Sequence, residues 1–307
     1  MARLLLFAAT TGYQIRVFSE TARRLGVDLT LATDRCRNLE DPWGDRAIPV
    51  RFGEVAQSIA ALGERRFDAV AAVGDAPALL AAEVAAALGI PFHPPAAVRA
   101  ANDKYLARQL FQAAGLAAPR FFRVALGDPA EAAAGRAPYP CVLKPLGLSG
   151  SRGVIRANDT GEFVAAFARI KNLLEKSPDI RRITRAEQRQ YLQVEEYIPG
   201  REFAVEGIVT HGAARILAMF DKPDPLEGPL FEETIYVTPS REGAARQQAM
   251  CETVVRAVRV LGLYHGPFHA ELRVRDDGAI TPLEVAARPI GGLCSKALRF
   301  GAGVPLE

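Results

Sequence analysis

The first part of the chain alternates short apolar runs with segments of helical apolar spacing. Residues 4–9 form an apolar run, and residues 13–26 carry apolar side chains at helical spacing before they end in glycine. Such runs are typical of buried strands, and the longer periodic segments are typical of amphipathic helices. Further strands are expected at 28–33, 47–52 and 68–75, and further helices at 55–66 and 77–89. The alternation predicts a parallel sheet with helices on both faces.

A proline-rich break at residues 90–98 ends this alternation. One helix is expected over 100–115, with Asn102 or Asp103 near its N-terminus. The later strands are predicted at 119–124, 140–146, 153–157, 191–198, 201–212, 213–223 and 233–240, with two more around the turn Asp277-Gly278 within 267–289. The later helices are predicted at 160–176 and 242–262. Glycine and proline turns join many of these strands, which favours antiparallel pairing.

Composition and charge narrow the class of protein. Of 307 residues, 49% are hydrophobic, and 38 basic against 35 acidic residues leave a net charge of +3. This balance favours neither a nucleic-acid partner nor a membrane surface, so we expect neither. The four cysteines, Cys36, Cys141, Cys251 and Cys294, are far apart and form no C-x-x-C pair. With an N-terminal apolar run too short for a signal peptide or a membrane span, we expect a cytoplasmic protein.

Lys144 stands inside the apolar run 140–146, where a charged side chain is costly unless its ammonium group meets an anion. The segment that follows, GLSGSRG at 147–153, offers flexible backbone N–H groups and hydroxyls that can surround phosphate oxygens. It is not a Walker A sequence. Lys104, early in the helix expected over 100–115, is a second candidate cation, although by itself it fits a solvated helix face better.

Two pairs of glutamates add candidate chemistry. Glu271 and Glu284 flank a tight turn in the middle of two adjacent strands, and two close carboxylates repel each other unless they are protonated or bridged by cations. Magnesium prefers such oxygen ligands beside phosphate. Outward-facing, solvated carboxylates explain the pair equally well. Glu195 and Glu202 flank a proline–glycine turn, where carboxylates can read the amino and hydroxyl groups of a nucleoside, although charged residues beside a turn are common.

The order of these clusters resembles that of the ATP-grasp superfamily: Lys104, Lys144 with its Gly/Ser segment, Glu195 with Glu202, then Glu271 and Glu284 followed by Arg288 and Gly291-Gly292. GPLFEETIYVTPS followed by HGPFHAELRV and PLEVAARPIGG looks like the C-terminal signature of carboxylate–amine ligases of the L-amino-acid ligase type. The resemblance covers nearly the whole chain. It implies an α/β and α+β protein, with an N-terminal parallel β/α domain followed by a two-lobed ATP-grasp fold.

The resemblance also implies domains and residue roles. The expected domains are an N-terminal β/α domain at 1–95, a linker helix and central lobe with the Gly/Ser loop at 96–194, and a C-terminal lobe with the metal site at 195–307. The expected ATP-binding residues are Lys104, Lys144, Ser149, Gly150, Ser151 and Gly153 for the phosphates, Glu195 and the backbone of Tyr197 and Ile198 for the adenine, and Glu202 for the ribose. Glu271 and Glu284 are expected to bind Mg2+, with Mn2+ as an alternative, and Arg288 and Lys144 to be catalytic.

The implied activity is an ADP-forming ligase that joins a carboxylate, from an amino acid or a similar small acid, to an amine through an acyl phosphate. Alternatives are an ATP-grasp carboxylase, a carbamoyl-phosphate-type enzyme and a non-catalytic ATP-binding protein. A Rossmann oxidoreductase is disfavoured because the first turn, ATTGYQ, lacks the G-x-G-x-x-G fingerprint. The identity of both substrates and the oligomeric state, including a homodimer, stay open.

Two features depart from the family pattern. Ala286 stands where many members have an asparagine that binds metal, which leaves the number of metal ions open. The chain also stops at Glu307, soon after the paired glycines, so we expect either a compact member or one without the C-terminal part that shapes the substrate pocket. Glu232, Glu233 and Arg241 are candidates for meeting a substrate, and a solvated loop explains them equally well.

Overall fold

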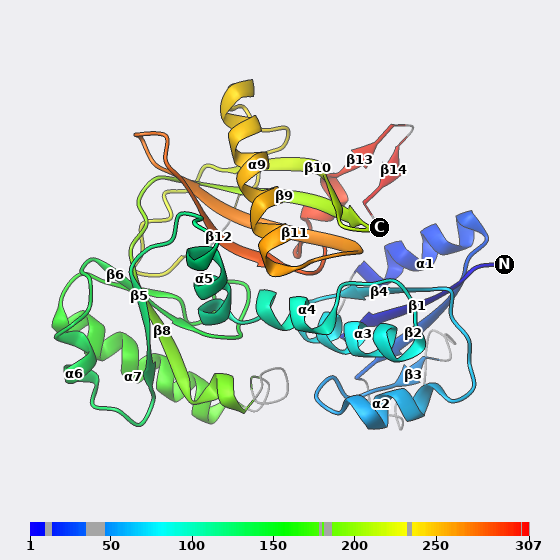
Figure 1. The fold of residues 1–307 in the computed structure, drawn as a ribbon, viewed down its shortest axis with the longest axis horizontal. Helices are drawn as coiled ribbons and strands as arrows, with labels where there is room; N and C mark the ends of the chain where they lie inside the picture. The colour runs from blue at the N-terminus through cyan, green and yellow to red at the C-terminus, as the bar shows by residue number, and fades with distance from the viewer. Residues whose placement is uncertain are drawn as a thin grey trace.

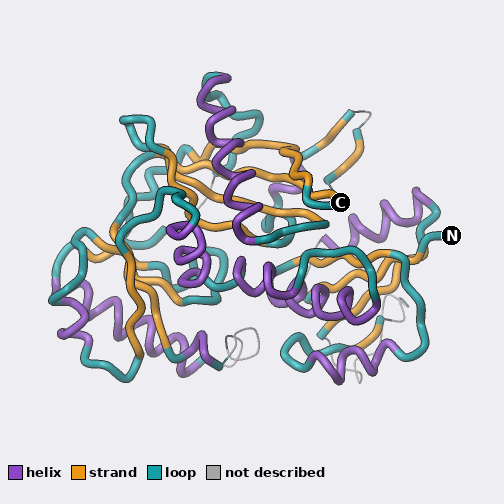
Figure 2. The backbone as a smooth tube through the Cα atoms, viewed as in Figure 1, coloured by secondary structure: helices purple, strands orange, loops and turns teal. Residues whose placement is uncertain are grey.

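Three four-stranded sheets form the framework of the protein (Figure 1). The computed structural model describes residues 1–9, 14–34, 47–177, 180, 186–231, 235–301 and 303–306. Figure 2 shows the strands of each sheet bordered by helices. Cys36, Glu232, Glu233 and most of the first turn, which carried sequence predictions, lie outside the described residues.

The N-terminal sheet is parallel, as the β/α alternation predicted. Its strands, in the order β3-β2-β1-β4, are β1 (Arg3–Ala8), β2 (Asp28–Thr33), β3 (Ile48–Pro49) and β4 (Ala69–Val73). Its helices are α1 (Gln14–Leu25), α2 (Val55–Leu62) and α3 (Asp75–Leu88). Leu5 packs in the core that contains α3, whereas Leu6 packs with Phe18 of α1. Helices therefore cover both faces of this sheet.

The chain leaves the N-terminal sheet through two helices, of which the second lies within the helix predicted over 100–115 and the first was not predicted. These helices are α4 (Pro95–Ala101) and α5 (Lys104–Ala113). The Asp103 carboxylate accepts a hydrogen bond from the Leu106 N–H at 3.1 Å and caps the start of α5. Asn102 and Asp103 stand between the two helices, and Asp103 takes the N-terminal position that was predicted for Asn102 or Asp103.

The central sheet is antiparallel, with the strand order β5-β8-β6-β7. Its elements are β5 (Phe121–Ala125), α6 (Ala130–Ala134), β6 (Cys141–Pro145), β7 (Ile155–Ala157), α7 (Thr160–Lys176), the 3-10 turn η1 (Glu187–Arg189) and β8 (Tyr191–Glu196). On β6, Cys141 and Leu143 belong to the core beneath α7, whereas Val142 and Lys144 face the opposite side. Strand alternation therefore turns Lys144 away from the core that surrounds it in the sequence.

The C-terminal sheet is also antiparallel, with the strand order β10-β9-β11-β12. Its elements are β9 (Arg201–Thr210), β10 (Ala213–Lys222), α9 (Ala244–Leu261), β11 (Gly266–Val274) and β12 (Ile280–Ala286). α9 crosses one face of the sheet (Figure 1), and this face shares a continuous hydrophobic core with the N-terminal sheet. The chain continues through α10 (Cys294–Ala297) and the short strands β13 (Arg299–Phe300) and β14 (Val304–Pro305).

The strand predicted over 233–240 does not form where the structure describes this segment. Residues 235–240 make only an isolated bridge, between Val237 and Asp221. Pro239 follows closely and has no N–H to extend the pairing. In the described part of the chain, no helix is both long and apolar enough to cross a membrane.

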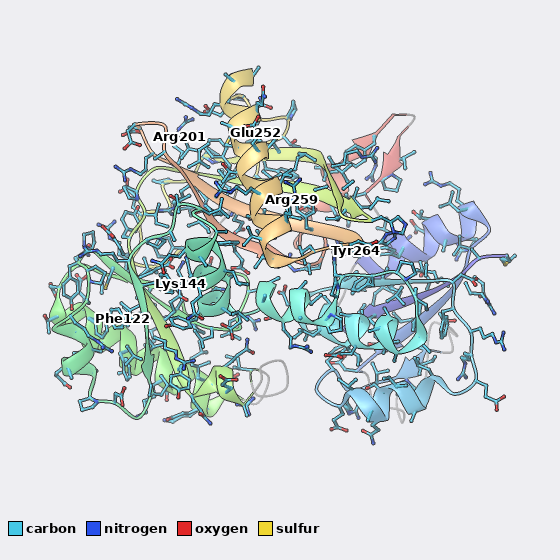
Figure 3. The ribbon with its side chains drawn as sticks, viewed as in Figure 1. Phe122, Lys144, Arg201, Glu252, Arg259 and Tyr264 are labelled. Carbon is cyan, nitrogen blue, oxygen red and sulfur yellow. The ribbon has the colours of Figure 1, made fainter. Side chains whose placement is uncertain are left out.

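His93 links the N-terminal half of the protein to the C-terminal sheet. Its Nε2 lies 2.9 Å from the Pro267 carbonyl oxygen, and its Nδ1 accepts a hydrogen bond from the Tyr264 N–H at 3.1 Å. Tyr264 lies between the end of α9 and β11, near the N-terminal domain (Figure 3). Only a neutral imidazole can accept at Nδ1 while donating at Nε2. Burial lowers the pKa of His93 to about 4.

We expect this buried histidine to make the fold sensitive to acid. Below a pH of about 6.5 the unfolded chain binds a proton that folded His93 resists until about pH 4, so stability is lost as the pH falls. The free energy of unfolding in urea should therefore fall by about 2 kcal/mol from pH 7.5 to pH 5 because of this group. His93→Gln should remove that part of the pH dependence. His211→Asn, at an exposed position, should keep it, and equal pH dependence in both variants would contradict the assignment.

Candidate functional site

A cavity of about 650 Å³ lies between the central and the C-terminal sheets. It is lined by residues from distant parts of the sequence, including most of the predicted site residues: Lys104, Lys144, Gly150, Ser151, Glu195, Tyr197, Ile198, Glu202, Glu271, Glu284 and Arg288. Ser149 and Gly153 belong to the same loop as Gly150 but are not among the residues that line the cavity. The fold therefore brings two lysines and two glutamate pairs to one place.

Strand alternation places ionisable side chains of β11 along one wall of this cavity. On β11, His269, Glu271 and Arg273 line the cavity, while the residues between them lie in the core beneath α9. Glu284 of β12 stands directly opposite Glu271, as the tight turn between the strands predicted. The register shifts after this pair, and Leu283 lines the cavity as well as Glu284. In a regular strand, neighbouring side chains point to opposite faces of the sheet. The irregularity lets both Leu283 and Glu284 reach the cavity.

Each of the two opposed carboxylates has a lysine partner. The Lys222 ammonium lies 2.8 Å from Glu271, and the Lys104 ammonium lies 3.0 Å from Glu284. Burial by itself raises the pKa of Glu271, but the positive charges of Lys222 and His269 lower that pKa well below its usual range. The cations therefore offset the repulsion between the two close carboxylates.

Lys222, which was not predicted as a site residue, lies at the centre of these charges. Its ammonium also lies 2.8 Å from Glu202, and its side chain is 1% exposed. The available signal was a lysine at the end of the apolar strand β10, the same kind of signal that identified Lys144. Its carboxylate partners Glu202 and Glu271 are 20 and 49 residues away, so the neighbouring sequence did not indicate them.

Glu195 is buried among three donors rather than exposed at the end of its strand. Its carboxylate pairs with the Lys144 ammonium, accepts from Arg108 Nε at 3.0 Å and accepts from Gln193 Nε2 at 2.7 Å. Burial raises the pKa of Glu195, but the charges of Arg108 and Lys144 outweigh burial and lower it to about 2. Arg108 also donates to the Pro282 carbonyl at 2.8 Å, so this buried guanidinium connects α5 with both sheets.

Glu202 and the segment before it form the next part of the wall. Glu202 accepts from Arg273 Nε at 3.0 Å, and Arg273 NH1 donates to the Ile198 carbonyl at 2.7 Å. The Tyr197 N–H donates to the Pro140 carbonyl at 2.9 Å, and the Tyr197 ring stacks against the Phe231 ring with 6.4 Å between their centroids. By contacting Ile198 and Glu202, Arg273 holds the proline–glycine turn between them, which was predicted to lie beside a nucleoside.

His269 connects Glu271 to the chain that follows β12. His269 Nδ1 pairs with Glu206, and its Nε2 lies 3.4 Å from Glu271. Glu206 in turn accepts from the Ile290 N–H at 3.1 Å. Burial lowers the pKa of His269, but Glu206 and Glu271 raise it to about 9. These contacts connect Glu271 to Ile290, the residue directly before the Gly291-Gly292 segment.

The Gly/Ser loop at 147–153 closes one side of the cavity. Lys104 Nζ donates to the Leu148 carbonyl at 2.7 Å and so ties the loop to α5. Gly150 and Ser151 both have positive φ, 64° and 52°, which turns the backbone sharply between them. A side chain at Gly153 would come within 2.9 Å of Pro145. Gly153 therefore serves the packing of the loop against β6.

The donor set fits a magnesium ion that is shared with phosphate. Magnesium is usually held by one or two carboxylates together with substrate phosphates, and Glu271 and Glu284 are such carboxylates. Ala286, on the same strand, offers no side-chain ligand. Among the described residues, no group of three or more histidines, cysteines or acids is arranged to hold a metal by itself. The remaining ligands would have to come from a bound phosphate compound or water.

Arg288, the last predicted site residue, lines the cavity and pairs with Asp75 at the start of α3. Burial lowers the pKa of Arg288, but Asp75 raises it above its usual value. Arg241, a candidate substrate contact, donates its backbone N–H to Asp221 at 2.9 Å and does not line the cavity.

Comparison with known proteins connects this geometry to one group of enzymes. Carnosine synthase 1 of Gallus gallus is 33% identical over 221 residues, which cover 69% of this chain and 23% of the relative. Alanine–anticapsin ligase of Bacillus subtilis is 27% identical over 202 residues, covering 62% of this chain and 42% of the relative. The chain therefore spans less than half the length of these two curated relatives.

A solved structure and a family model agree with these relatives. The crystal structure of an L-amino acid ligase from Bacillus licheniformis has a TM-score of 0.76 and 26% identity, covering 95% of this chain and 68% of that chain. The model of the ATP-grasp domain matches residues 137–297, which contain the C-terminal sheet, the central sheet except β5, and nearly the whole cavity wall. Because this match extends over more than half of the 307 residues, the chain belongs to the ATP-grasp family.

Proposed function

We propose that this protein is an ATP- and Mg2+-dependent ligase that joins a carboxylate to an amine and releases ADP and phosphate. One observation carries the proposal. Lys104 and Lys144 line the same cavity as the opposed carboxylates Glu271 and Glu284, and these carboxylates pair with Lys222 and Lys104. Phosphoryl transfer requires the protein mainly to position groups and to balance the charge of the phosphates. Fixed cations beside two carboxylates that can bind a metal ion meet this requirement.

The arrangement of charges supports one direction for ATP in the cavity. Its phosphates lie at the lysine and glutamate wall, where Lys104, Lys144 and the loop at 147–153 meet them. Glu271 and Glu284 would hold Mg2+, which would supply positive charge beside the phosphates. The adenine lies towards Tyr197 and Ile198, and Glu202 faces the ribose hydroxyls.

Nucleotide binding requires Glu195 to exchange partners. A carboxylate offers about four acceptor positions, and Arg108, Lys144 and Gln193 occupy those of Glu195. When Lys144 turns to a phosphate, it frees an acceptor position for the adenine amino group. Arg108 stays and keeps the buried carboxylate paired, because leaving it uncompensated would be strongly unfavourable. Adenine recognition and phosphate binding are therefore coupled through Glu195.

The reaction has two steps with balanced charges. An oxygen of the substrate carboxylate attacks the γ-phosphorus, the bond to the β-phosphate oxygen breaks, and ADP leaves an acyl phosphate behind. The amine nitrogen then attacks the acyl carbon and loses a proton as phosphate departs, which leaves an amide. Arg288 and Lys144 stabilise the negative charge of the transferring group. The names of the ligase relatives support an amino acid as one substrate.

Phosphate release from ATP tests this function. The purified chain with ATP and Mg2+ is screened against pools of amino acids, singly and in pairs, with product detected by mass spectrometry. We expect release that requires an acid and an amine together and stops when EDTA removes the metal. Release that requires bicarbonate instead would identify a carboxylase, and tight ATP binding without release would identify a non-catalytic ATP-binding protein.

A further inference from the structure

The N-terminal domain contributes one carboxylate to the edge of the cavity. Asp75 is the first residue of α3, directly after β4 and Gly74. Arg288 Nε donates to Asp75 Oδ1 at 3.0 Å, and Arg288 NH2 donates to Asp75 Oδ2 at 3.4 Å. The Asp75 side chain is 20% exposed and the Arg288 side chain 13%, so the pair is well shielded from water. This two-point contact joins residues that are 213 positions apart.

The contact fixes how Arg288 faces the cavity. A guanidinium has five N–H groups in one plane. Two of those of Arg288 are used by Asp75, and a third donates to the Pro289 carbonyl at 3.0 Å. Because the two-point contact sets the plane of the group, it also sets the direction of the N–H groups that remain for a ligand in the cavity.

Asp75 also competes with the other acids around Arg288. The charges of Glu284 and Glu206 both act on Arg288, but neither pairs with it directly in the described residues. Without Asp75, the guanidinium would be drawn towards Glu284, which is the proposed metal ligand. Asp75 therefore keeps the cation and the metal carboxylate apart.

The Gly/Ser loop also lies close to Asp75. Burial raises the pKa of Asp75, but the charge of Arg288 and the nearby Ser149 side chain lower it. Ser149 belongs to the loop at 147–153 and is not among the cavity-lining residues. Asp75 therefore stands beside both antiparallel lobes, near Ser149 of the central lobe and in contact with Arg288 of the C-terminal lobe.

We propose that Asp75 is a positioning residue for the reaction, holding the Arg288 guanidinium in its working orientation at the edge of the cavity. This inference rests on the proposed ligase function. It gives the N-terminal domain a part in the chemistry, through Arg288, in addition to its packing against the C-terminal sheet. Asp75 itself touches neither ATP nor the reacting atoms in this assignment.

The kinetic test is a double-mutant cycle with Asp75→Asn and Arg288→Lys. Asp75→Asn should lower kcat by ~10²-fold, with the KM for ATP within about threefold of the original. Because Asp75 acts through Arg288, the double variant should be no slower than Arg288→Lys alone. Asp68→Asn, which breaks the exposed Arg3–Asp68 pair of the same domain, should leave kcat unchanged. An unchanged kcat in Asp75→Asn, or an equal loss in both backgrounds, would overturn the proposal.

A second readout does not depend on catalysis. Urea unfolding of the original chain, Asp75→Asn, Arg288→Lys and the double variant measures whether the two side chains act on each other. Because they share a shielded two-point contact, the stability losses of the single variants should not add in the double variant. Additive losses would overturn the contact and with it the positioning role. An original chain that releases no phosphate would refute the ligase, while the unfolding cycle would still decide this contact.

Discussion

Replacing Glu284 by alanine is expected to abolish most ATP turnover while leaving the fold intact. Glu284 is one of only two carboxylates proposed to hold Mg2+, and Ala286 offers no replacement ligand. Loss of one preorganised charge at the transferring phosphate should lower kcat by ~10²–10³-fold. The cost in stability should be about 1 kcal/mol, because the Glu284–Lys104 pair is partly exposed and Lys104 keeps its bond to the Leu148 carbonyl.

The measurement compares phosphate release and thermal unfolding in the original chain and the variant. Glu252→Ala is the matched control, because Glu252 is an exposed glutamate on α9, away from the cavity lining (Figure 3). The control should keep full activity. Normal ATP turnover and ligation by Glu284→Ala would refute the metal site and, with it, the proposed function.

Lys144→Ala should have the second large effect, and its effect should fall on ATP. Removing this ammonium takes a cation from the phosphates, so we expect a loss of ~10²-fold in kcat/KM for ATP with a raised KM. The fold should survive because Glu195 keeps Arg108 Nε at 3.0 Å and Gln193 Nε2 at 2.7 Å. A variant without any cation beside this buried carboxylate would be far less stable.

Nucleotide binding and initial rates separate this effect from a general loss of structure. Lys176→Ala removes an exposed lysine in the last turn of α7, in the same lobe, and should change neither quantity. If Lys144→Ala bound ATP and turned it over as well as this control, Lys144 would have only a structural role beside Glu195. A bound-nucleotide structure with Lys144 turned away from the phosphates would lead to the same conclusion.

Sequence patterns predicted the structure correctly where residues close together in the chain determine it. The turn at Asp277-Gly278 made Glu271 and Glu284 partners across two strands, and the structure confirms their pairing. The β/α alternation likewise predicted the parallel sheet before residue 90. Asp103, predicted near the start of a helix, caps α5, whereas α4 was missed because it starts at Pro95 inside a proline-rich segment that was read as a break.

Partners that lie far apart in the chain could not be found in this way. Arg108 reads as one more polar residue of an amphipathic helix, yet it is 2% exposed and pairs with Glu195, 87 residues away. Lys222 meets Glu271 49 residues away, and Asp75 meets Arg288 213 residues away. Nothing in the spacing of these residues indicates such contacts, because they depend on how the sheets and the N-terminal domain pack together.

The sequence by itself determined the elements, the ionisable residues of each strand and the order of the clusters that resembles the ATP-grasp family. These properties follow from periodicity, turns and residue type, which act over a few neighbouring positions. Only the tertiary structure decided which cation meets which carboxylate in the cavity. Pairing inside a shielded space depends on distance and burial, and both are set by the packing of the sheets, α5 and α3 against one another.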